Sequence, residues 1–85
     1  MTDSTLSNGT SILLVEDDKS MAALCTAYLK SANYHVEHAL NGEEALEKLN
    51  DQLPDVLLLD LQLPDIHGSD ILKHIQQNQL PIETI

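Results

Sequence analysis

Residues 55–60 read Asp-Val-Leu-Leu-Leu-Asp, an apolar run that follows a proline and ends abruptly in a carboxylate. Residues 12–17 have the same design, because Ile-Leu-Leu-Val is followed at once by Glu16 and Asp17. A short strand that is apolar on both faces is typical of the middle of a parallel sheet covered by helices. The two runs therefore predict two buried strands, each of which ends in acidic residues.

An amphipathic segment follows the first of these strands. Apolar residues recur at helical spacing from about residue 19 to 32, which predicts a helix with one apolar stripe. The stripe consists of Met21, Leu24, Cys25, Tyr28 and Leu29. Its place on the stripe predicts that Cys25 is a core residue. Asp17 or Asp18 suits the N-cap of this helix.

Two further elements precede the second apolar run. Residues 34–39 are expected to form a short strand, and Asn41-Gly42 makes a turn. Asn41 suits the N-cap of a second helix, with Glu44 three residues on as its capping-box partner. The buried face of that helix is predicted to be Ala45, Leu46 and Leu49.

After the second apolar run, residues 61–68 contain Pro64 and Gly68 and read as a loop. A third helix then carries one apolar face, formed by Ile71, Leu72 and Ile75. Residues 80–85 resemble the start of a fourth strand. Residues 1–10 are polar, rich in Ser and Thr, and predict a flexible tail.

Strands that alternate with helices predict a doubly wound α/β fold, a parallel sheet with helices on both faces. Ligands of such sheets bind at the carboxyl ends of the strands. If the two apolar strands are neighbours, Glu16, Asp17 and Asp60 converge there. Like charges that close repel one another unless a cation neutralises them, and a small cluster of oxygen ligands suits Mg²⁺. Carboxylates also serve as nucleophiles in aspartyl-phosphate chemistry.

Helix capping is the simpler explanation for an acid that follows a strand, and it suits Asp17 or Asp18. It explains Asp60 less well, because a loop and not a helix follows that residue. The histidines have ordinary interpretations too: His35 and His38 read as surface positions on a strand, and His67 as a loop side chain.

Composition limits the classes of function. The 85 residues allow one small domain, and 14 acids against 4 bases, a net charge of -10, argue against direct contact with nucleic acid. The single cysteine, Cys25, excludes an intramolecular disulfide. The first residues lack the pattern of a secretory signal, and no apolar run is long enough to span a membrane. We expect a cytoplasmic protein that does not enter the membrane.

Three stretches, residues 12–18, 41–46 and 55–68, resemble the receiver domain of two-component response regulators, the CheY-like family. The resemblance covers residues 11–85 and implies a flavodoxin-like sheet. By position it implies that Asp60 is the phosphoacceptor, forming 4-aspartylphosphate. It also implies that Mg²⁺ is bound by Glu16, Asp17, Asp60 and the backbone carbonyl of Gln62. The phosphoryl donor would be a sensor histidine kinase or a histidine phosphotransfer protein.

The chain departs from the family pattern at its end. Receivers carry a Ser or Thr after the fourth strand and a Lys after the fifth, and this chain ends at Ile85, before both. The resemblance therefore predicts a partial receiver that lacks the switch and is marginally stable alone, with an exposed sheet edge. In the full-length protein, further domains would regulate transcription, and dimerisation is an open expectation. Residues 21–29 are similar to receivers of sigma-54-dependent quorum-sensing regulators.

Two alternatives stay open at this point. The first is a receiver-like interaction module without phosphotransfer, although such modules typically lose one of the acids that this chain retains. The second is a phosphohydrolase with an aspartate nucleophile. Those enzymes need a general acid two residues after the nucleophile, where this chain has Gln62.

Overall fold

The computed structural model describes residues 10–59 and 68–84. Strands and helices alternate along the chain, as the sequence predicts. The elements are β1 (Ser11–Val15), α2 (Lys19–Ser31), β2 (His35–Ala39), α3 (Gly42–Asp51), β3 (Val56–Leu59), α4 (Gly68–Gln77) and β4 (Glu83–Thr84). Each predicted element is present, with bounds that differ by a few residues at most.

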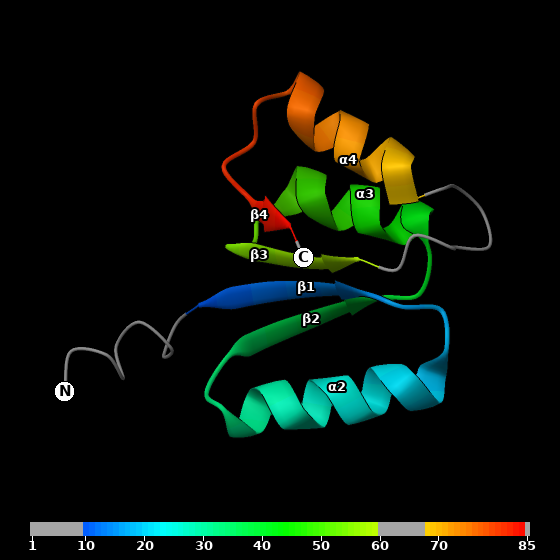
Figure 1. Cartoon of the computed structure of the whole chain (residues 1–85), viewed down its shortest axis with the longest axis vertical. Coiled ribbons are helices and arrows are strands. Elements are labelled where there is room, and N and C mark those ends of the chain that lie inside the picture. The colour runs from blue at the N-terminus through cyan, green and yellow to red at the C-terminus, as the bar shows by residue number, and fades with distance from the viewer. Residues whose placement is uncertain (1–9, 60–67, 85) are drawn as a thin grey trace, which may run out of the picture.

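The four strands form one parallel sheet in the order β2-β1-β3-β4 (Figure 1). This is the strand order of the flavodoxin-like fold, so the predicted topology is confirmed. β1 lies in the middle, and its last residue, Val15, pairs with Ala39 of β2 and with Leu59 of β3. The two apolar strands are therefore direct neighbours that run in the same direction.

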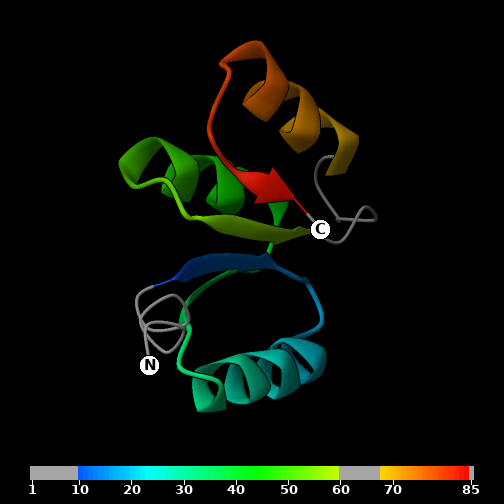
Figure 2. The same cartoon turned by 60° about the vertical axis from the view of Figure 1, so that its left-hand side comes forward.

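Helices cover both faces of the sheet (Figures 1 and 2). α3 and α4 lie together on one face, and α2 lies alone on the other. Because side chains alternate along a strand, Leu13 and Val15 join the core beneath α3 and α4, whereas Leu14 belongs to the α2 face. That core consists of Leu13, Val15, Ala39, Ala45, Leu49, Leu57, Ile71 and Ile75.

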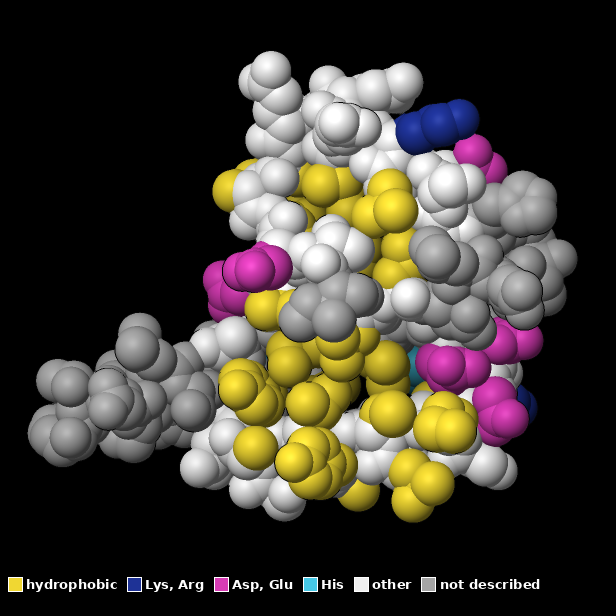
Figure 3. All heavy atoms as spheres, viewed as in Figure 1, with side chains coloured by type: hydrophobic (Ala, Val, Ile, Leu, Met, Phe, Trp, Pro, Cys, Tyr) yellow, Lys and Arg dark blue, Asp and Glu magenta, His cyan; other side chains and the backbone are white. Residues whose placement is uncertain are grey.

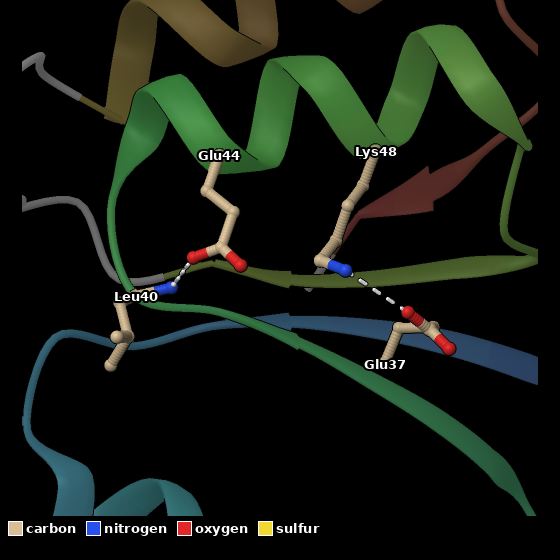
Figure 4. A network of polar contacts seen from close by, with 4 residues as sticks. All are labelled: Glu37, Leu40, Glu44 and Lys48. Atoms are coloured by element: carbon tan, nitrogen blue, oxygen red, sulfur yellow. Dashed lines mark hydrogen bonds and ion pairs between the residues drawn. The ribbon is translucent and has the colours of Figure 1, made fainter.

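The predicted N-caps are present. Asp18 Oδ1 accepts a hydrogen bond from the amide of Met21 at 3.0 Å, which identifies Asp18 as the cap of α2. Asn41 Oδ1 accepts from the amide of Glu44 at 2.8 Å. The return bond of this capping box goes to the residue before the cap, because Glu44 Oε1 accepts from the amide of Leu40 at 2.8 Å (Figure 4).

The predicted burial of the α2 stripe is wrong. Met21, Leu24 and Tyr28 are 49%, 69% and 75% exposed, and the buried residue of the helix is Ala22. Cys25, expected in the core, is half-buried. Helical spacing indicates an apolar stripe but not which side of the helix faces the sheet. The less exposed residues of α2 are Ala22, Cys25, Thr26 and Leu29, so the stripe is only partly turned toward the sheet. Apolar side chains consequently gather on the surface over α2 (Figure 3).

Leu72 of α4 was predicted on one apolar face with Ile71 and Ile75. It is 36% exposed, whereas Ile71 and Ile75 of that face are buried. Leu72 follows Ile71 by one position, about 100° around the helix, so it falls at the rim of the buried face.

Hydrogen bonds connect the amino ends of the two central strands, β1 and β3. Asp55 Oδ2 accepts from the amide of Ser11 at 2.9 Å and from its hydroxyl at 3.2 Å. The amide of Asp55 in turn donates to the carbonyl of Ser11 at 2.9 Å. These bonds hold β1 and β3 in register, because a slip would break all of them.

The predicted tail, residues 1–10, falls outside the described residues except for Thr10. The carbonyl of Thr10 accepts from the amide of His35 at 3.0 Å. No helix within the described ranges is long and apolar enough to cross a membrane.

Candidate acidic site at the carboxyl edge of the sheet

Glu16 and Asp17 follow β1 directly, at the edge where parallel strands present their carboxyl ends. The amide of Glu16 donates to the carbonyl of Ala39 at 3.0 Å, which extends the β1–β2 ladder by one residue. Glu16 Oε2 accepts from the amide of Asp18 at 3.2 Å. The chain then turns into α2, so both acids lie near the N-terminus of a helix, where negative charge is favoured.

The three consecutive acids have different environments. Asp18 is committed to the cap of α2. Glu16 is half-buried and folded back toward the helix start. Asp17 is exposed, and its carboxylate makes no hydrogen bond or ion pair with the described part of the chain. Of the three, Asp17 has the carboxylate oxygens that are most available to a ligand.

On the neighbouring strand, Leu59 is the last described residue of β3 and the partner of Val15. The next residue along the chain is Asp60, which lies outside the described residues, as do Gln62 and His67. Within residues 10–59 and 68–84, no three His, Cys, Asp or Glu side chains are grouped as metal ligands. The convergence of Glu16, Asp17 and Asp60 therefore stays a prediction.

The donor chemistry of Glu16 and Asp17 fits a hard cation. Both supply carboxylate oxygens, which Mg²⁺ prefers. Neither has a lysine partner within the part of the chain that the structure describes. The ion pair that the structure does show lies elsewhere: Lys48 Nζ of α3 is 3.1 Å from Glu37 Oε1 of β2 (Figure 4).

A surface hollow among the described residues lies away from these acids. It is at the amino ends of the strands, around Ser11, Tyr34 and Leu53, and includes neither Glu16 nor Asp17. The acidic edge is a candidate site because of its residue types and the register of β1 and β3.

His38 was predicted as a surface position, and the structure corrects this. It is half-buried, and its Nε2 lies 2.8 Å from the carbonyl oxygen of Glu16. The missed signal is the two-residue period of β2, which places His38 on the same face as Val36 and opposite Leu14. His35, also predicted at the surface, is exposed.

Comparison with known proteins decides the family. The response regulator receiver domain family matches residues 12–85, nearly the whole chain. The chain belongs to the response regulator receiver family. This confirms the resemblance to receiver domains that residues 12–18, 41–46 and 55–68 indicated.

Regulators of known sequence are similar to this receiver chain. A transcriptional regulator of Haloferax volcanii is 41% identical over 69 residues, covering 81% of this chain and 12% of the relative. Response regulator ArlR of Staphylococcus saprophyticus is 41% identical over 70 residues, covering 82% and 32%. Luminescence regulatory protein LuxO of Vibrio campbellii is 38% identical over 72 residues, covering 85% and 16%. The receiver chain thus spans at most about a third of these relatives.

Solved receiver structures match the fold. The signal receiver domain of a LuxO repressor protein from Vibrio parahaemolyticus has a TM-score of 0.84 and 37% identity, covering 88% of this chain and 58% of that one. Response regulator TrrA from Thermotoga maritima, solved in complex with Mg²⁺-BeF, has a TM-score of 0.83 and 29% identity, covering 88% and 65%. LuxO and ArlR match about equally well, so the quorum-sensing branch stays a prediction.

Proposed function

We propose that this receiver chain accepts a phosphoryl group on Asp60 in two-component or phosphorelay signal transduction. The observation that carries the proposal is the register of β1 and β3. Val15 and Leu59 are paired, and they are the residues that precede Glu16 and Asp60. Parallel strands in that register direct the chain that follows them toward one edge of the sheet.

The donor would be a phosphohistidine of a sensor histidine kinase or a histidine phosphotransfer protein. A carboxylate oxygen of Asp60 attacks phosphorus, the phosphorus–nitrogen bond breaks, and its electron pair leaves with the imidazole. Glu16, Asp17, Asp60 and the carbonyl of Gln62 would hold Mg²⁺, which when bound stabilises charge on the phosphoryl oxygens. Water later attacks phosphorus, the bond between phosphorus and the Asp60 oxygen breaks, and inorganic phosphate leaves the regenerated carboxylate. Asp60 is thus an acceptor, and the chain is not a conventional turnover enzyme.

The setting follows from the same proposal. The chain would act in the cytoplasm, where the phosphoryl donor meets it, and regulate transcription through parts of the full-length protein outside these residues. Its net charge of -10 makes direct contact of this segment with nucleic acid unfavourable. Dimerisation of the full-length protein belongs to the proposal as well.

One observation favours an interaction module as the alternative. Leu24 and Tyr28 of α2 are 69% and 75% exposed, and exposed apolar side chains that gather on one face are typical of protein contacts. A receiver that bound partners through α2 without phosphotransfer would leave Asp60 unmodified. An experiment that detects phosphate on Asp60 therefore separates the two functions.

The test exposes the full-length protein to acetyl phosphate with Mg²⁺ and measures its intact mass. We expect a base-labile gain of one phosphate that disappears in Asp60→Asn and when a chelator removes the metal. The matched control is Asp51→Asn, an exposed aspartate at the end of α3, which should gain phosphate as the wild type does. A wild type that gains none, or an Asp60→Asn variant that gains as much, rejects the proposal.

A further inference from the structure

His38 contacts the acidic edge from the neighbouring strand. It lies on the α2 face of β2, opposite Leu14 of β1, and lines a groove with Ala22 and Thr26 of α2. Its Nε2 is 2.8 Å from the carbonyl oxygen of Glu16, a hydrogen-bond distance. The ring is half-buried, so water competes for this contact less than it would on an open surface.

The partner of His38 determines where the ring carries its proton. A main-chain carbonyl accepts hydrogen bonds and cannot donate one. Nε2 of His38 must therefore bear a hydrogen and act as the donor. The contact selects a ring form in which Nε2 is protonated, and it directs the N–H at the peptide that joins Glu16 to Asp17.

The peptide between Glu16 and Asp17 lies just past the last hydrogen bond between β1 and β2. β1 ends at Val15, and the amide of Glu16 still bonds to the carbonyl of Ala39 at 3.0 Å. The bond from His38 holds the carbonyl of the same residue. Peptide groups are planar, so fixing the planes on both sides of the Glu16 Cα fixes its two backbone dihedrals. The direction of the Glu16 side chain and the placement of Asp17 follow from those dihedrals.

We propose that His38 is a positioning residue for the acidic pair. By donating from Nε2 to the Glu16 carbonyl, it orients Glu16 and Asp17 to bind Mg²⁺ at the carboxyl edge. This inference rests on the proposed function, because it assigns a role in that same site. His38 does not touch the metal or the phosphoryl group, and it acts through the backbone of Glu16.

The matched variants separate this role from simple packing. In His38→Gln, the side-chain amide nitrogen lies about as far from the backbone as Nε2 of histidine and keeps an N–H donor. In His38→Asn the amide is one carbon shorter and cannot reach Glu16, and in His38→Leu the donor is gone. His35→Leu is the control, since His35 is an exposed residue of the same strand.

The experiment titrates the full-length protein with MgCl₂ by calorimetry and measures unfolding in urea beside it. Loss of a residue that holds a metal ligand in place without touching the metal weakens metal binding by about 10–100-fold. Because this contact acts through the backbone, we expect about tenfold weaker binding in His38→Leu and His38→Asn. His38→Gln and His35→Leu should bind as the wild type does. Should His38→Leu not fold, the Asn and Gln pair makes the same comparison.

Several results would overturn the inference. Equal Mg²⁺ affinity in the wild type and His38→Asn removes the positioning role and leaves the proposed function standing. Equal weakening in His38→Gln and His38→Asn shows that packing, and not the N–H, matters. A wild type that binds no Mg²⁺ rejects the proposed function and this inference together. Nitrogen chemical shifts of the ring give a second measurement, because an Nε2 without hydrogen contradicts the contact itself.

Discussion

Glu16, Asp17 and Asp18 are consecutive in the sequence yet differ in what their carboxylates do. Asp18 Oδ1 caps α2 by accepting from the amide of Met21. Asp17 is exposed, and its carboxylate makes no hydrogen bond or ion pair with the described residues. From the sequence, either Asp17 or Asp18 could be the N-cap of α2. Which of the two caps the helix depends on the backbone geometry of one turn, which the sequence does not reveal. The contact of His38 with Glu16 was missed for a similar reason, since strand pairing brings together residues that are distant in the chain.

Asp18→Ala should lower the free energy of unfolding by about 1 kcal/mol, because the amide of Met21 loses its acceptor. Urea denaturation measures this. Phosphate acceptance should survive at Mg²⁺ concentrations that saturate the variant. Complete loss of acceptance in a folded Asp18→Ala variant would contradict the assignment of Asp18 as a cap.

Asp17→Asn should have the opposite pattern. Without metal its stability should stay within about 0.5 kcal/mol of the wild type, because an exposed carboxylate with no partner contributes little. Its affinity for Mg²⁺ should fall sharply, since a charged ligand is gone. Calorimetric titration beside urea denaturation shows both effects, and unchanged Mg²⁺ affinity would remove Asp17 from the proposed site.

At the scale of elements, the pairing of β1 with β3 is what relates Glu16 to the end of the next strand. The apolar runs predicted both strands, and the alternation with helices predicted that they run parallel. Their register could not be predicted, because it depends on contacts such as Ser11 with Asp55, which are distant in sequence. The face that α2 buries was predicted wrongly, since one apolar stripe of a helix does not reveal where the sheet lies.

Asp55→Ala should destabilise the protein, because it removes the acceptor of two bonds from Ser11 at 2.9 and 3.2 Å. We expect a loss of about 1 kcal/mol in urea denaturation, a typical net value for exposed hydrogen bonds. Ser11→Ala removes the hydroxyl, which donates to Asp55 Oδ2 at 3.2 Å and accepts from the amide of Asp55 at 3.1 Å. Both backbone groups keep a partner in this variant, because the amide of Ser11 still donates to Asp55 Oδ2 and the amide of Asp55 to the carbonyl of Ser11, so it should cost less. A larger loss in Ser11→Ala than in Asp55→Ala would contradict this account of the register.

In the whole molecule, more of the hydrophobic core among the described residues lies beneath α3 and α4 than beneath α2, where Leu14 and Ala22 are buried. α3 and α4 bury Leu57 completely on their side of the sheet, whereas on the other side α2 leaves Leu24 69% exposed. The α/β class was predictable from the alternation of strands and helices, and the flavodoxin-like strand order from the resemblance to receivers. The unequal burial of the two faces of the sheet was not predictable, because it depends on how α2 is rotated about its own axis.

Leu57→Ala and Leu24→Ala therefore make a matched pair. The first opens a cavity in the core and should cost about 2–5 kcal/mol of stability. The second removes side-chain atoms that already face solvent and should cost less than about 0.5 kcal/mol. Denaturation of both variants in urea compares them, and equal losses would show that the α2 stripe is buried in solution.

The central claim is that Asp60 accepts the phosphoryl group, and locating the modified residue tests it most directly. The full-length protein is exposed to acetyl phosphate and Mg²⁺, then reduced with borohydride, which converts an acyl phosphate of aspartate to homoserine. Peptide mass spectrometry then identifies the converted position. We predict conversion at Asp60, dependent on Mg²⁺. No conversion, or conversion at Asp17 or Asp55 instead, would contradict the claim.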